Sequence, residues 1–65
     1  MEMIDRILEI LNERGISNPQ FYTAIGISKS TFSRWKAKKI SISVKNVEKI
    51  ADYLGVSVDS LLGKQ

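Results

Sequence analysis

The stretch that decides the fold is residues 18–37, NPQFYTAIGISKSTFSRWKA. Ser17 stands directly before it and lies three residues ahead of Gln20, which is the spacing of a capping box. A helix is therefore expected to begin at Asn18. Gly26 is suited to end that helix about eight residues later, because glycine adopts the left-handed conformation without strain.

A second helix is expected near 29–37. Ser28 can cap it through its hydroxyl, and Ile27 and Phe32 have the spacing of a hydrophobic staple. Only residues 26–28 connect the two helices. A connection this short suits helices that cross at a steep angle rather than helices that pack antiparallel.

The second helix has an apolar face and a polar face. Phe32 and Trp35 share one side at helical spacing, which indicates core residues rather than the base-stacking aromatics of single-strand binders. The other side is then left to Lys29, Ser30, Ser33, Arg34 and Ala37.

Further helices are expected on both sides of this stretch. Apolar residues recur at helical spacing in 2–14 and after Ser43, and each run stops at a glycine followed by an apolar residue. Ser57 can cap a short last helix. The apolar positions are Ile4, Ile7, Leu8, Leu11, Val47, Ile50, Ala51, Leu54, Val58, Leu61 and Leu62. Residues 40–44 alternate briefly, but a lone strand would have no partner, so a loop is expected around 38–42. The predicted class is all-α with five helices.

Basic side chains are concentrated in the middle of the chain. The formal net charge is +3, and it divides into −2 for residues 1–28, +6 for residues 29–49 and −1 for residues 50–65. A block of this kind attracts polyanions through phosphate neutralisation and counterion release. Taken alone, it is equally compatible with a lysine-rich surface that serves solubility.

The composition excludes several classes of protein. Sixty-five residues make one domain without a large substrate cleft. The absence of cysteine and histidine removes disulfides, Ser-His pairs and the usual zinc sites, and the seven carboxylates join no catalytic motif. We therefore expect no enzyme, no metal, no cofactor and no small-molecule ligand. Without a membrane span or signal peptide, the expected location is the cytoplasm.

These segments resemble the helix-turn-helix of phage repressor and Cro-type transcriptional regulators. In that family five apolar positions surround a turn glycine, and here Gly26 is surrounded by Phe21, Ile25, Ile27, Phe32 and Trp35. Residues 47–63, VEKIADYLGVSVDSLLG, are similar to the family's ending. The resemblance implies a compact five-helix lambda-repressor-like DNA-binding fold. It covers residues 1–65 as a single domain, with the motif at 18–37.

The resemblance also implies that the helix at 29–37 enters the major groove of double-stranded DNA. The groove is about 12 Å wide and admits one helix, whose first turns reach the base edges. The base-reading candidates are Lys29, Ser30, Ser33 and Arg34, the alternatives being phosphate contacts for the two cations and plain helix surface for the serines. The phosphate-contact candidates are Asn18, Gln20, Ser28, Lys36, Lys38, Lys39, Lys45 and Asn46. Helix capping is the alternative for Asn18, Gln20 and Ser28, and a solvated charge is the alternative for each lysine.

Regulators of this type commonly bind inverted repeats as homodimers. The dimer candidates are Tyr53, Val58, Leu61 and Leu62, the alternative being that these leucines complete the monomer core. The predicted function is sequence-specific DNA binding by a transcriptional regulator, a repressor of phage or prophage type. Such a protein is expected in the cytoplasm of a bacterial or phage-infected cell, associated with the nucleoid. The chain is then either a complete Cro-like protein or a fragment of a longer repressor. The alternative is a protein-interaction module, such as an antitoxin or anti-repressor, that uses the same exposed helix.

Three positions depart from the family's pattern. Tyr22 replaces a small residue, so either its ring swings to the edge or the two helices lie further apart. Lys38 stands where a glycine commonly ends the recognition helix, and a left-handed conformation there costs roughly 1 kcal/mol. Ile42 replaces a frequent proline and can pack inward.

Overall fold

The computed structural model describes residues 2–63, which contain five helices and no strand. The helices are α1 (Met3–Arg14), α2 (Asn18–Ile25), α3 (Lys29–Lys36), α4 (Val44–Leu54) and α5 (Val58–Leu61). The predicted all-α class and the loop around 38–42 are confirmed. Helix α1 begins one residue later than predicted because Glu2 is its N-cap, and α3 ends one residue earlier because Ala37 is its C-cap. Met1 and Gln65, the ends of the predicted domain, lie outside the described residues.

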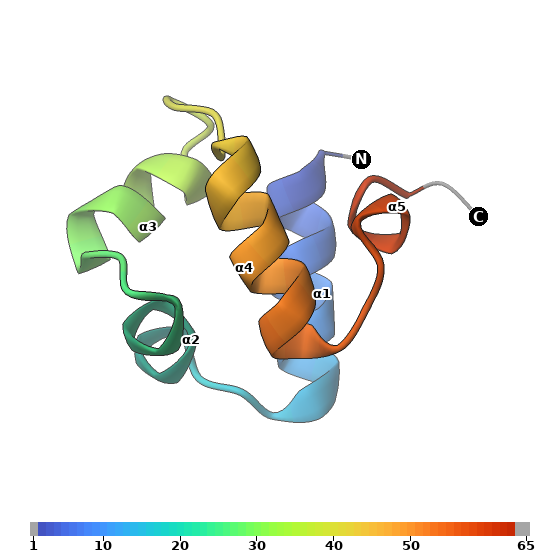
Figure 1. Ribbon diagram of the computed structural model, residues 1–65. Coiled ribbons are helices and arrows are strands. Elements are labelled where there is room, and N and C mark those ends of the chain that lie inside the picture. The colour runs from blue at the N-terminus through green and yellow to red at the C-terminus, as the bar shows by residue number, and fades with distance from the viewer. Residues whose placement is uncertain (1, 64–65) are drawn as a thin grey trace.

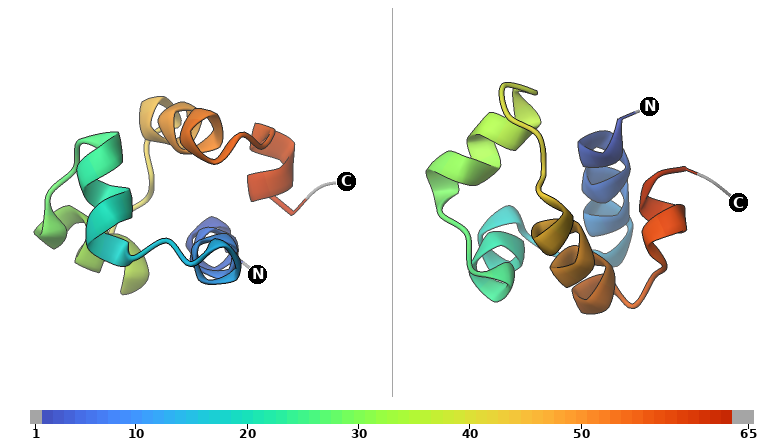
Figure 2. Two further views of the ribbon diagram at one scale, coloured as in Figure 1. Left: turned by 90° about the horizontal axis from the view of Figure 1, so that it is seen from below. Right: turned by 45° about the horizontal axis from the view of Figure 1, so that its top comes forward.

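Helices α3 and α5 lie on opposite sides of the molecule, with α1 and α4 between them (Figures 1 and 2). Helix α3 packs against α1 and α2, and α2 packs in turn against α4. Helix α5 closes the other side by packing against α1 and α4. Consequently α3 forms an outer edge of the molecule, away from the C-terminal helix. None of the helices within residues 2–63 is long and apolar enough to cross a membrane.

Four of the five helices have a serine as their N-cap residue. The hydroxyl oxygens of Ser17, Ser28, Ser43 and Ser57 each accept a hydrogen bond from the backbone N–H three residues later, at 3.1–3.3 Å. The capping box expected at Ser17 and Gln20 is present. Each such cap stabilises its helix by about 1 kcal/mol, because it satisfies a backbone donor that the helix itself leaves free.

The first four helices end in one and the same turn. In each, a residue with left-handed backbone is followed by one whose N–H donates to the carbonyl five residues earlier. The left-handed residues are Gly15, Gly26, Lys38 and Gly55, with φ between 61° and 78°. Lys38 thus has the conformation expected for it. Within residues 2–63 it is the only residue other than glycine with a positive φ.

The core is entirely apolar in the described part of the chain. It takes residues from all five helices, and Ile42 packs against it as expected. The buried residues are Ile4, Ile7, Ile10, Leu11, Phe21, Ile25, Phe32, Trp35, Val47, Ile50, Ala51, Leu54 and Leu61. Arg14 adds a polar link at the rim, where its guanidinium donates a hydrogen bond to the backbone carbonyl of Leu54 at the end of α4.

Candidate DNA interface

Two aromatic side chains fix how α3 is rotated. Phe32 and Trp35 are each 2% exposed, so both point into the core as predicted. The Phe32 ring meets the Phe21 ring of α2 edge to face, with 5.7 Å between ring centroids. Because turning α3 would expose both rings to water, the side that faces solvent is set by the core.

Tyr22 occupies the position where α2 approaches α3 most closely in the predicted motif. Its ring is half-buried and packs against Phe32, with the centroids 5.7 Å apart and the planes inclined at 45°. The Tyr22 ring therefore adds to the contact between the two helices.

The outward face of α3 carries the four base-reading candidates. Lys29, Ser30, Ser33 and Arg34 are all exposed, and within residues 2–63 no side-chain hydrogen bond or ion pair engages them. The first turn of α3 has no acidic residue and begins with Lys29. A cation at a helix N-terminus opposes the helix dipole, whereas a phosphate there is favoured by it. The dipole of α3 therefore favours a phosphate from outside the protein at this end over the ammonium group of Lys29.

Three phosphate-contact candidates lie at the starts of α2 and α3. Asn18 is exposed, while Gln20 accepts a hydrogen bond from the Ser17 N–H at 3.4 Å and keeps its amide donors free of that cap. The Ser28 hydroxyl donates to the hydroxyl of Thr31 at 3.0 Å. Ser28 would have to break that bond to donate to a phosphate.

The other candidates follow α3 or begin α4. Lys36 is exposed, with its Nζ 5.2 Å from the centroid of the Phe32 ring, a cation–π distance. Lys39 and Lys45 are exposed and pair with no carboxylate in the described part of the chain, and Asn46 is half-buried. All four residues lie within the basic block of residues 29–49.

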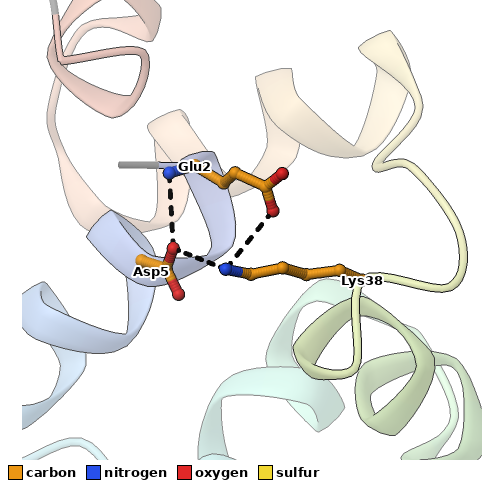
Figure 3. Close-up of polar contacts among 3 residues, drawn as sticks. All are labelled: Glu2, Asp5 and Lys38. Carbon is orange, nitrogen blue, oxygen red and sulfur yellow. Dashed lines mark hydrogen bonds and ion pairs between the residues drawn. The ribbon is translucent and has the colours of Figure 1, made fainter.

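Lys38 differs from its neighbours because two carboxylates at the start of α1 pair with its ammonium group. Its Nζ lies 3.0 Å from Asp5 Oδ2 and 3.5 Å from Glu2 Oε2 (Figure 3). The hydrogen bond from Lys38 lowers the pKa of Asp5, and the same bond raises the pKa of Lys38. Sequence reasoning missed Glu2 and Asp5 as partners. No local signal could have found them, since Asp5 lies 33 residues from Lys38.

The dimer candidates do not form one exposed group. Leu61 is 1% exposed and fills the monomer core, so its side chain is not accessible to a second copy. Tyr53 is 37% exposed, and its ring packs against the Phe21 ring of α2, with 6.0 Å between the ring centroids. Val58, the first residue of α5, is 37% exposed, and Leu62, the C-cap of α5, is 45% exposed. Two further apolar residues are exposed: Ile40 within the loop after α3, and Val44 at the start of α4.

These features are those of a helix-turn-helix DNA-binding domain. Two capped helices are joined by a tight glycine turn, and the second helix has a buried inner face and a polar outer face. The chain belongs to the family of Cro/C1-type HTH DNA-binding domains, whose family model matches residues 6–64. That family consists of regulators that bind double-stranded DNA, and not of enzymes. Neither a curated protein nor a solved structure matches the chain.

Proposed function

We propose that this protein is a transcriptional repressor of phage or prophage type that inserts α3 into the major groove of its operator. The observation that carries the proposal is the outward face of α3. It is basic and polar, makes no side-chain hydrogen bond or ion pair within residues 2–63, and lies opposite the buried Phe32 and Trp35. The protein-interaction alternative would favour acidic or large apolar residues on this face, and none is there.

Base reading falls to the first two turns of α3. Lys29 and Arg34 have the donors that guanine O6 and N7 accept, and a bidentate contact of this kind discriminates by about 1–3 kcal/mol against a wrong base. Ser30 and Ser33 can donate or accept, so each specifies a base only weakly. Sequence preference is therefore assigned mainly to the two cations.

Contacts with the sugar-phosphate backbone come from both ends of the motif. Asn18, Gln20 and Ser28 supply donors at helix N-termini, where phosphates are favoured by the helix dipole. On the other side the proposed contacts are Lys36, Lys39, Lys45 and Asn46. Lys38 instead pairs with the carboxylates of Glu2 and Asp5.

Repression follows if two copies occupy an inverted repeat and block access to it. Half-sites one helical turn apart are separated by roughly 34 Å along the DNA. The exposed candidates for the contact between copies are Tyr53, Val58 and Leu62. A function on chromosomal or phage DNA also places the protein in the cytoplasm.

Selection of duplexes from a random pool tests this function. The expected result is a two-fold symmetric consensus whose affinity falls steeply between 50 and 200 mM salt. Lys29→Ala and Arg34→Ala are expected to relax the preference at defined base pairs, and Glu13→Gln, an exposed substitution on α1, serves as a control. Enrichment of no consensus, or binding that does not change with salt, would refute the proposal.

A further inference from the structure

The turn after α3 carries a lysine in a conformation that favours glycine. Lys38 has φ 61°, its N–H donates to the Trp35 carbonyl, and the Lys39 N–H donates to the Arg34 carbonyl. From this turn the Lys38 side chain extends across to the beginning of α1, as Figure 3 shows. Its ammonium thereby connects two segments that are far apart in the sequence.

The carboxylate that receives Lys38 is itself held in place. Asp5 Oδ2 accepts the hydrogen bond from Lys38 and also one from the Glu2 backbone N–H at 3.3 Å, as part of the capping box of α1. Glu2 places a second carboxylate 3.5 Å from the same ammonium. The Lys38 ammonium is therefore attracted by two negative charges, whereas an isolated surface ion pair supplies only one.

The pairing separates Lys38 from the lysines on either side of it. Lys36 lies over the Phe32 ring, and Lys39 pairs with no carboxylate in the described part of the chain. A cation already neutralised by two carboxylates gains less from a phosphate, because binding would first have to break those contacts. Of these three lysines, Lys38 is the one least available to DNA.

We propose that Lys38 is a positioning residue that fixes the turn after α3 to the start of α1, and that Glu2 and Asp5 withhold its charge from DNA. The inference rests on the proposed function, in which α3 lies in the major groove. Lys36 and Lys39 then bind phosphate while Lys38 remains on α1. Removing the two carboxylates converts Lys38 into a phosphate-binding residue.

The salt dependence of binding to a short mixed-sequence duplex tests this. The salt slope is the magnitude of the negative slope of log K against log salt, and each phosphate contact adds about 0.9 to it. We expect Lys38→Gln to leave the slope unchanged and Lys39→Gln to lower it by about 0.9. We expect the double variant E2Q/D5N to raise the slope by about 0.9. Asparagine at position 5 keeps the oxygen that caps α1.

Two controls separate the effect of Lys38 from that of net charge. E13Q/D59N removes two carboxylates on α1 and α5 that make no ion pair within residues 2–63, and it is expected to leave the slope unchanged. In the Lys38→Gln background the rise caused by E2Q/D5N is expected to disappear. A rise that persists there, or a slope lowered by Lys38→Gln itself, would overturn the proposal. If Lys38→Gln does not fold, Lys38→Gly replaces it, since glycine suits the backbone.

The free protein supplies an independent measurement. Titration of Asp5 by NMR is expected to give a lowered pKa in the wild type and a return toward the ordinary value in Lys38→Gln. An unchanged Asp5 pKa in the variant would overturn the positioning role. If the wild type bound no duplex, the proposed function would fail, while this titration would still decide whether Asp5 holds Lys38.

Discussion

Helices α2 and α3 end in the same backbone turn, built from Gly26 and Ile27 in one case and from Lys38 and Lys39 in the other. At the end of α2 both residues serve folding, since the glycine adopts a positive φ without strain and the isoleucine packs against the core. At the end of α3 both side chains are exposed cations, and the first one strains the backbone. The comparison teaches that one and the same turn can end a helix with two residues that favour folding or with two exposed cations, the second at a cost in backbone strain.

The largest effect is expected from giving the end of α2 the residues of the end of α3. The double variant G26K/I27K should lower the free energy of unfolding by about 2–3 kcal/mol, because a left-handed lysine is strained and the packing of Ile27 is lost. Urea denaturation measures this. Gly26→Ala isolates the backbone part at about 1 kcal/mol, since a β-carbon there meets no atom within 4 Å. Unchanged stability of the double variant would show that the two turns do not differ as argued.

The reverse exchange at the second position should weaken DNA binding. Lys39→Ile supplies the apolar residue that follows the other three turns and removes one proposed phosphate contact. We expect the salt slope of duplex binding to fall by about 0.9, with no loss of thermal stability. Lys39→Gln should give the same slope. If only the isoleucine variant lowered it, altered packing rather than lost charge would be responsible.

A smaller effect is expected when the first position becomes glycine. Lys38→Gly keeps the positive φ but removes its strain. The substitution also removes the ion pairs with Glu2 and Asp5, which are exposed to solvent and therefore weakened by salt. Thermal unfolding should show a variant more stable than the wild type at high salt, with a smaller difference at low salt. A less stable variant at high salt would mean that the strain at Lys38 is negligible.

The smallest effect is the pH dependence of the Lys38 ion pair. The lowered pKa of Asp5 means that its contribution to stability is complete above the ordinary value of 3.8 and disappears as the pH falls through the lowered one. The raised pKa of Lys38 means that the contribution is complete below 10.5 and disappears as the pH rises through the raised value. The difference in melting temperature between wild type and Asp5→Asn should be constant between these limits. A difference that changed near neutral pH would contradict this assignment.

Local signals in the sequence were sufficient for the helices and for the inner face of the motif. Serine caps and glycine turns act within a few residues, so they located the helix ends to within one residue. The spacing of Phe32 and Trp35 predicted their burial because both lie on one helix. The positive φ of Lys38 was predictable as well, since the turn after a helix demands it.

Contacts between distant segments were beyond the reach of such signals. The pairing of Lys38 with Asp5 depends on how α1 packs against the end of α3, and nothing near either residue encodes it. Whether Leu61 faced the core or a second copy depended in the same way on the packing of α5 against α1 and α4. The base-reading residues could be proposed from position alone, and their chemistry with DNA remains a prediction.

The outward face of α3 also bears on how such a protein acquires a new operator. Lys29, Ser30, Ser33 and Arg34 contribute nothing to the core and cap no helix, so exchanging them should alter stability by no more than about 0.5 kcal/mol each. Folding and the proposed base reading thus depend on different residues of one eight-residue helix. Duplicated copies of this domain could diverge in sequence preference through four surface positions, while the rest of the chain stays the same.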